Sequence, residues 1–364
     1  MRVPGRGFLP LTTRRLEIRA LDRRDITRFT HYRNLVDVWR YQDWDVPYTR
    51  DHAHSLIDSQ EGITGPVLGA WVQLAVDDGG GLAGDIAVWL DPAGQLAMVG
   101  YTLAPEAQGR GYATEAVGAV VDRLFAKSRV HRVAATLDPR NLESARVLER
   151  LGFRYEGCAL RAALVRGEWE DDDRYAILAD ERRAWVRRPQ GPPALVELVD
   201  VTHDNVRRVS ALGTHRSQRA FVATVAESFG DALVPEEVDG ARVVPWFRAI
   251  AADGGLVGFV MIAERTEAHP VTFLWRLLID RRHQRRGIGE RALDLIAGKL
   301  LTDGEHRLLT SWVPGRGSPE SFYRRLGFEP TGVVIDGEIE AGVELVELRR
   351  RVGWRTADAV RARR

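Results

Sequence analysis

The hexapeptide QGRGYA at residues 108–113 has a closely similar counterpart, QRRGIG, at residues 284–289. The two begin 176 residues apart, since 284 minus 108 is 176. The triplet Leu-Gly-Phe also occurs twice, at 151–153 and 326–328, with a spacing of 175 (327 minus 152). Two different motifs that keep their register to one residue over such a distance indicate an internal repeat.

Apolar spacing on either side of each hexapeptide predicts a strand before it and a helix after it. The strands are expected at 97–103 and 273–279, and the helices at 113–126 and 288–301. Glycines let a backbone approach a ligand closely, and the first amides of a helix point outward with the positive end of the helix dipole behind them. Each loop therefore predicts a site for a phosphate group.

Two other kinds of phosphate-binding protein do not fit these loops. The Gly-x-Gly-x-x-Gly fingerprint of dinucleotide-binding domains is absent at both positions, and no Gly-Lys-Ser/Thr sequence is present to form a P-loop. Hydride transfer and nucleoside-triphosphate hydrolysis are therefore disfavoured as functions.

The order of elements continues alike in the two halves. Each expected helix is followed by a strand, a second helix ending in the Leu-Gly-Phe triplet, and another strand. Paired strands joined by Asp/Gly-rich turns precede each hexapeptide. Each half is thus a meander of strands leading into a β-α-β-α unit, which predicts an α+β fold with a mixed central sheet flanked by helices.

The length of 364 residues favours two domains. Between the repeats lies RRPQGPP at residues 187–193, where prolines forbid a continuous helix and glycine adds flexibility. We therefore expect a first domain over residues 1–188, a linker at 189–193, a second domain over 194–350 and a basic tail over 351–364.

Charge and cysteine content exclude several classes of partner. The 52 basic residues balance 51 acidic ones, so the net charge of +1 offers no general field for nucleic acid or anionic lipid. Cys158 is the single cysteine, which excludes an internal disulfide and a thiolate zinc cluster and fits a reducing compartment. No signal peptide or membrane span is evident, so we expect a cytoplasmic protein without a metal.

The repeated signature resembles that of the GCN5-related N-acetyltransferase (GNAT) superfamily, and the resemblance covers nearly the whole chain in two copies. The first half is similar to the ribosomal-protein alanine N-acetyltransferase type at residues 11–16, 40–44, 100–103 and 141–145. The second half is similar to the diamine acetyltransferase type at residues 221–223, 258–260, 274–280 and 318–323. The resemblance implies two tandem acyl-CoA N-acyltransferase domains that use acetyl-CoA as the acyl donor.

The resemblance also implies which residues hold the coenzyme, through backbone groups at the end of the strand and the amides of the loop. In the first half these are Thr102, Leu103, Gln108, Gly109, Arg110, Gly111, Tyr112 and Ala113, with Asn141 beside the coenzyme arm. In the second half they are Leu278, Ile279, Gln284, Arg285, Arg286, Gly287, Ile288 and Gly289. Arg316 stands at the aligned place there, so the resemblance does not imply that contact in the second half.

Acyl transfer to an amine needs a proton for the departing thiolate. Tyr323, four residues before Gly327, stands where the superfamily often has a tyrosine facing the sulfur, so we expect it to be the general acid. The first half has Leu148 at that place, so either another group, with Ser144 the nearest matching candidate, protonates the thiolate there or that half has lost the chemistry. A helix cap is the competing role for Ser144.

These features predict an N-acetyltransferase that acts on a primary amine by direct transfer in a ternary complex. The acceptor could be a polyamine, an aminoglycoside-like small molecule or a protein N-terminus. Carboxylates at Glu227, Asp231, Glu236, Glu237 and Asp239 suit a cationic acceptor but do not assign one. The alternatives are an antibiotic-modifying or biosynthetic enzyme with one structural half, and a coenzyme-binding regulatory module without turnover.

Overall fold

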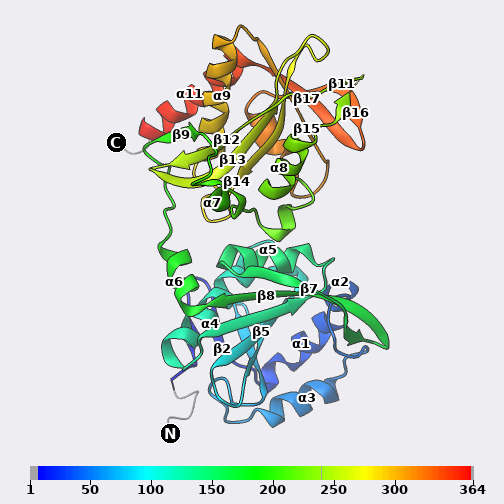
Figure 1. Cartoon of the computed structure of the whole chain (residues 1–364). Helices are drawn as coiled ribbons and strands as arrows, with labels where there is room; N and C mark the ends of the chain where they lie inside the picture. The colour runs from blue at the N-terminus through cyan, green and yellow to red at the C-terminus, as the bar shows by residue number, and fades with distance from the viewer. Residues whose placement is uncertain (1–6, 239, 362–364) are drawn as a thin grey trace. The chain divides into compact units, whose positions relative to one another are not determined.

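The computed structural model describes residues 7–238 and 240–361, and for Val238 and residues 354–361 it describes the backbone alone. The chain divides into two compact units, Met1–Arg187 and Arg188–Arg364, which we call the first and second domains and describe separately (Figure 1). Among the described residues no helix is both long and apolar enough to cross a membrane.

The first domain is built on a mixed sheet of eight strands in the order β1-β2-β3-β4-β5-β6-β8-β7, in which only β5 and β6 run parallel. Helices α1 and α3 pack on one face and helices α4 and α5 on the other. The elements are β1 (Leu11–Thr12), β2 (Glu17–Ala20), η1 (Arg23–Asp25), α1 (Ile26–Arg33), α2 (Val36–Trp39), α3 (Arg50–Ser59), β3 (Trp71–Asp77), β4 (Leu82–Leu90), β5 (Leu96–Leu103), η2 (Pro105–Ala107), α4 (Tyr112–Lys127), β6 (Arg132–Leu137), α5 (Leu142–Leu151), β7 (Arg154–Val165), β8 (Glu168–Leu178) and α6 (Ala179–Arg187).

The second domain repeats this plan on a seven-stranded sheet in the order β16-β17-β15-β14-β13-β12-β9. Helices α7 and α8 pack on one face, and α9, α10 and α11 on the other. The elements are β9 (Val196–Val199), α7 (Val206–Ser210), η3 (Arg216–Gln218), α8 (Val225–Leu233), β10 (Glu237–Val238), β11 (Ala241–Arg242), β12 (Pro245–Ala252), β13 (Gly255–Ala263), β14 (Thr272–Ile279), α9 (Ile288–Thr302), β15 (Arg307–Trp312), α10 (Glu320–Arg325), β16 (Glu329–Ile335), β17 (Glu338–Glu344) and α11 (Leu345–Arg361).

In both domains the parallel strand pair separates after three residue pairs. Strands β5 and β6 pair from Leu96 to Met98, and β14 and β15 pair from Thr272 to Leu274. Beyond these points each first strand continues to its glycine loop without its parallel neighbour. The gap leaves strand edges whose backbone groups can bind a ligand.

The expected α+β architecture is confirmed, with the strand, loop and helix of each repeat within a few residues of the expected bounds. Helix α11 continues past residue 350, the expected end of the second domain, and Val352 in the expected tail is buried in the core together with α9 residues. The last residues of that tail, 362–364, lie outside the described part of the chain.

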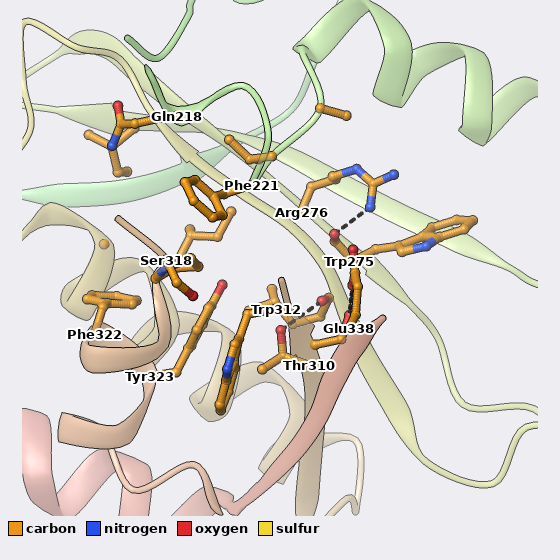
Figure 2. A pocket seen from close by; sticks show the side chains of 18 of the residues that line it. Gln218, Phe221, Trp275, Arg276, Thr310, Trp312, Ser318, Phe322, Tyr323 and Glu338 are labelled. Atoms are coloured by element: carbon orange, nitrogen blue, oxygen red, sulfur yellow. Dashed lines mark hydrogen bonds between the residues drawn. The ribbon is translucent and has the colours of Figure 1, made fainter. Parts of the chain in front are cut away.

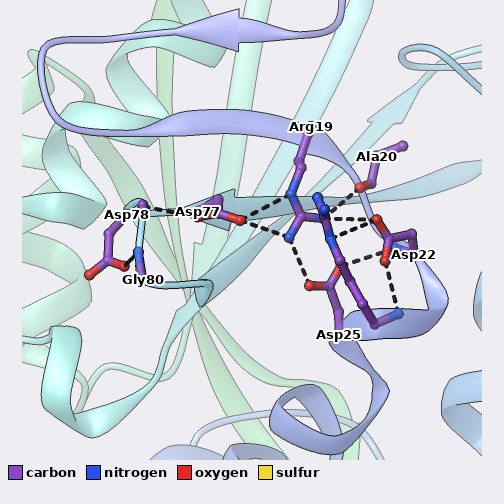
Figure 3. A network of polar contacts seen from close by, with 9 residues as sticks. Arg19, Ala20, Asp22, Asp25, Asp77, Asp78 and Gly80 are labelled. Atoms are coloured by element: carbon purple, nitrogen blue, oxygen red, sulfur yellow. Dashed lines mark hydrogen bonds and ion pairs between the residues drawn. The ribbon is translucent and has the colours of Figure 1, made fainter.

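A buried ion-pair network ties the strands of the first domain to its first helical turn (Figure 3). The guanidinium of Arg19 on β2 donates to both carboxylate oxygens of Asp25, at 2.7 and 2.8 Å, and to Asp77 at the end of β3 at 2.9 Å. Asp25 is 3% exposed and Arg19 is 9% exposed. Loss of Arg19 would therefore leave a desolvated carboxylate without its cation.

We expect Arg19→Met to destabilise the first domain by about 3–5 kcal/mol, the usual result of removing one partner of a buried pair. Arg19→Lys should lose less, because the charge remains while the two-pronged geometry is lost. Urea unfolding of the full chain, followed through the transition of the first domain, measures both values. Equal stability of wild type and Arg19→Met would show that the network contributes nothing net.

Candidate active site

A cavity with a volume of about 1180 Å³ lies in the second domain, where β14 and β15 separate. Its wall brings together the loop before α9, the strands β14, β15 and β17, and the helix α10 (Figure 2). Within the described residues no group of three or more His, Cys, Asp or Glu side chains is placed to hold a metal ion.

The glycine loop has the shape that a phosphate site requires. Gly287 is the N-cap of the 15-residue helix α9 with φ +74°, and Arg285 also has a positive φ of +63°. A Cβ added at Gly287 would meet no atom within 4 Å. The first amides of α9 have no carbonyl partner within the helix, so they are available to an anion in this open space.

The side chain of Gln284 fastens this loop to the strand before it. Its amide donates to the carbonyl oxygen of Ile279 at 3.0 Å and to Oε1 of Gln218 at 2.9 Å. In the first domain Gln108 repeats the contact, donating to the carbonyl oxygen of Leu103 at 3.1 Å. The glutamine of the motif thus joins the loop to the preceding strand through its side chain. The sequence did not indicate Gln218, because it lies 66 residues from Gln284.

The side chain of Arg286 is directed away from the phosphate site and is buried. Its Nε donates to the carbonyl oxygen of Gly191 at 2.8 Å, and Nη1 lies 3.1 Å from Nδ1 of His283. Burial lowers the pKa of His283, so its ring is neutral and can accept from the guanidinium. The expected linker is therefore attached to the second domain, and only the backbone of Arg286 is available to a ligand.

Tyr323 lies on α10 with its ring buried and its hydroxyl directed toward the cavity (Figure 2). The ring stacks on Trp312 of β15, with centroids 5.7 Å apart and planes 10° apart. Burial raises the pKa of Tyr323 to about 12, although a hydrogen bond with the Thr310 side chain lowers it in part. The phenol is held in place and stays protonated at neutral pH, as a proton donor requires.

The strands β15 and β17 supply the opposite side of the cavity. Ser311 donates through Oγ to Oε2 of Glu338, and Glu340 accepts from Thr331 Oγ1 at 2.7 Å. Glu227 and Glu236, two of the expected carboxylates, also line the cavity. The other expected carboxylates are not among the described residues that line the cavity. Asp231 pairs with Arg276, Glu237 pairs with Arg242, and Asp239 lies outside the described residues.

A close approach of backbones precedes each loop. Gly84 on β4 and Gly258 on β13 pair in register with the last residues of β5 and β14. A Cβ at Gly84 would lie 2.3 Å from the carbonyl oxygen of Thr102, and at Gly258 it would lie 2.5 Å from that of Leu278. Only glycine permits this close approach. The approach fixes the positions of the carbonyl groups of Thr102 and Leu278, two residues that we expected to hold the coenzyme.

The glycine loop of the first domain is also preserved. Gly109 and Gly111 have φ of +70° and +79°, and Gly111 is the N-cap of α4. Arg15 braces the loop by donating to the carbonyl oxygen of Arg110 at 2.9 Å and pairing with Glu115 at 2.7 Å. Its guanidinium would lie 3.4 Å from a Cβ on Gly111, so a cation stands beside the expected phosphate site.

The donor position of the first domain differs from that of the second. Leu148 is fully buried in the core, and Tyr101 of β5 bonds instead to Ser144, with its hydroxyl 2.8 Å from Oγ and 2.9 Å from the carbonyl oxygen. Asn141 is the helix cap, because its side chain accepts from the amide of Ser144 at 3.1 Å. The helix cap is thus Asn141 and not Ser144. The Oδ1 atom of Asn141 is already occupied by this hydrogen bond within the protein.

Comparison with known proteins matches each domain separately. Residues 15–154 match the family model described as an acetyltransferase (GNAT) domain, and residues 215–328 match that of the acetyltransferase (GNAT) family. The probable N-acetyltransferase YjcK of Bacillus subtilis is 46% identical over 84 residues, which is 23% of this chain and 46% of that protein. The [ribosomal protein uS5]-alanine N-acetyltransferase of Escherichia coli is 36% identical over 73 residues, covering 20% and 38%.

The chain thus spans less than half the length of each of these two relatives. Among solved structures, a GNAT-family acetyltransferase from Bacillus anthracis is 27% identical and covers 47% of this chain and 98% of its own, with a TM-score of 0.42.

Proposed function

The chain belongs to the GNAT acetyltransferases, as two such domains in tandem, and from this premise we propose that its second domain transfers the acetyl group of acetyl-CoA to a primary amine. One observation carries the proposal. A single cavity is lined by the glycine loop before α9, the protonated phenol of Tyr323 and the carboxylates of β17. These are the three parts that direct acyl transfer needs: a donor site, an acid and an acceptor site.

The residues around the loop fit a pyrophosphate. The amides from Gln284 to Gly289 surround the N-terminus of α9, and open space stands above Gly287. Along β14, the backbone of Leu278 and Ile279 lies beyond the last pair with β15 and would hold the pantetheine arm. In the first domain the backbones of Thr102, Leu103 and Gln108 to Ala113 would serve in the same way.

Tyr323 would act as the general acid. Its hydroxyl protonates the thiolate that leaves when the amine attacks the thioester carbonyl. The stacked indole of Trp312 keeps the phenol ring in one orientation while this happens. Direct attack by the amine needs no nucleophilic cysteine, and the described residues that line the cavity include none.

The first domain supports a secondary role. Leu148 cannot donate a proton, so Ser144, hydrogen-bonded to Tyr101, would have to act as the donor there. We expect transfer in the first domain to be slow or confined to a separate substrate, because the buried Leu148 stands at the donor position and the hydroxyl of Tyr101 is engaged with Ser144.

A free-thiol assay with acetyl-CoA tests the proposal. Spermidine, an aminoglycoside and a peptide with an N-terminal alanine serve as acceptors, since the relatives do not decide among these amine classes. Thiol release that depends on one of them supports the proposed function. Tight acetyl-CoA binding with no release for any of the three would instead favour a regulatory module.

We also expect calorimetry with coenzyme A to find one site in each domain, because both loops keep a left-handed glycine at the helix N-terminus. Gly287→Val should remove the second-domain site and Gly111→Val the first-domain site, since each added side chain would occupy the phosphate space. A stoichiometry of one in the wild-type chain would contradict the two-site expectation.

A further inference from the structure

The cavity of the second domain has two sides, one on each face of the sheet. Leu308 and Trp312 of β15 belong to the core under α9, and Thr310 shares their face. Ser311 alternates with them and so points to the other face. On β17, Ala341 and Val343 join the same core, which sends Glu338 and Glu340 to the face of Ser311. Tyr323 therefore approaches the gap from one face and Glu338 from the other.

Figure 2 shows Tyr323 and Glu338 on opposite sides of the pocket. Trp275, which also lines the cavity, packs with the α7 and α8 side of the sheet. The separation of β14 from β15 after Leu274 connects the two faces. An acceptor that enters beside Glu338 would thus meet a thioester held against Tyr323.

The charged residues that line the cavity suit a cation. Asp336 and Glu340 line it from the same hairpin as Glu338, and the acids that line it from elsewhere in the domain are Glu227, Glu236, Glu264 and Glu290. The basic residues that line it are Arg219, Arg276, Arg285, Arg325, His269 and His283. Arg276 is paired with Asp231 at 3.0 Å and also donates to the carbonyl oxygen of Trp275. In the part of the chain that the structure describes, no ion pair involves Glu338, whose partner is the Ser311 hydroxyl.

Strand β13 offers no competing carboxylate at this point. In the first domain, Asp85 follows Gly84 and pairs in register with Thr102, but Tyr32 and Arg33 bind its carboxylate and leave it 1% exposed. The residue that follows Gly258 in the second domain is Phe259, which is fully buried. In the second domain, β17 supplies carboxylates to the cavity at Glu338 and Glu340.

We propose that Glu338 binds the ammonium group of the acceptor and removes its proton before acetyl transfer, an inference that rests on the proposed function. The acceptor is then an alkyl amine that arrives protonated, rather than an aromatic amine that is neutral at pH 7. The hydrogen bond from Ser311 fixes one carboxylate oxygen and leaves the other for the ammonium.

The proton transfers balance. Glu338 takes one proton from the ammonium, and the amine attacks the acetyl carbonyl, so that a C–N bond forms and the C–S bond breaks. Tyr323 gives its proton to the departing thiolate, and the nitrogen returns its second proton to Tyr323 as it becomes an amide. Glu338 then releases its proton to solvent, so each turnover yields an amide, a thiol and one proton.

The test uses the full chain and whichever of spermidine, the aminoglycoside and the alanyl peptide the wild type acetylates fastest. Glu338→Gln should lower kcat/KM at pH 7 by roughly 10²- to 10³-fold, as expected for loss of a general base. The loss should shrink as the pH rises toward the pKa of the acceptor, because solvent then supplies the neutral amine. Glu338→Asp should recover part of the rate.

Glu344→Gln is the matched control, since Glu344 ends the same strand, is exposed and does not line the cavity. It should retain wild-type kinetics, and calorimetry with coenzyme A should find both variants fully able to bind. A wild-type-like kcat/KM for Glu338→Gln at pH 7, or a loss that does not change with pH, would overturn this inference alone. A wild-type chain that acetylates none of the three acceptors would overturn the proposed function.

Discussion

Replacing Tyr323 with phenylalanine is expected to lower kcat by roughly 10²- to 10⁴-fold while coenzyme affinity stays near that of the wild type. The change removes one hydroxyl and keeps the ring that stacks on Trp312 and contacts Phe322 and Phe328. Packing is therefore preserved, and the missing proton donor accounts for the loss. Steady-state thiol release at saturating acetyl-CoA measures kcat, and calorimetry measures affinity.

The pH profile of the wild-type enzyme gives a second test of Tyr323 as the proton donor. Burial raises the pKa of Tyr323 to about 12, above the ordinary value for a phenol, so the hydroxyl stays protonated and able to donate throughout the range from pH 6 to 10. The wild-type kcat should therefore show no decline near pH 10 from ionisation of Tyr323. A decline centred on the ordinary phenol pKa would mean that the donor is more exposed than Tyr323.

A control separates chemistry from general effects of tyrosine substitution. Tyr155→Phe in the first domain also removes one hydroxyl from a partly buried ring and should leave kcat unchanged. If Tyr323→Phe likewise keeps the wild-type kcat, Tyr323 is a packing residue of the second core and another group protonates the thiolate.

The local geometry of the loops could be predicted from sequence because glycine reports backbone conformation directly. Gly111 and Gly287 both have a positive φ and are the N-caps of α4 and α9. Their positions in the sequence therefore predicted where both helices begin. Arg285 adopts the left-handed conformation that Gly109 has in the first copy, and nothing in its residue type indicates this.

The parts of the site that sequence missed depend on contacts between distant segments. Gln218 reaches Gln284 across 66 residues, and Arg286 reaches Gly191 across 95. Glu338 was missed because its position on the same face of the sheet as Ser311 follows from the pairing of β15 with β17, which no local pattern records. The sequence could not show whether Asn141 or Ser144 caps the helix, because both residue types cap helices and only the structure shows which oxygen accepts.

The second large effect concerns which domain carries out the transfer. Gly287→Val should abolish activity, because the added side chain enters the space in front of the first amides of α9. Gly111→Val should keep most of it, because the first domain has Leu148 where the second has Tyr323. Both glycines have a left-handed φ, so the two substitutions carry a similar backbone strain of about 1–3 kcal/mol, and each serves as the control for the other.

The most direct measurement is thiol release from acetyl-CoA by wild type, Gly111→Val and Gly287→Val, side by side with the fastest acceptor and with folding checked by circular dichroism. We predict no release above background for Gly287→Val and most of the wild-type rate for Gly111→Val. If Gly111→Val instead loses most of the activity while Gly287→Val keeps it, and both remain folded, the first domain and not the second carries out the transfer.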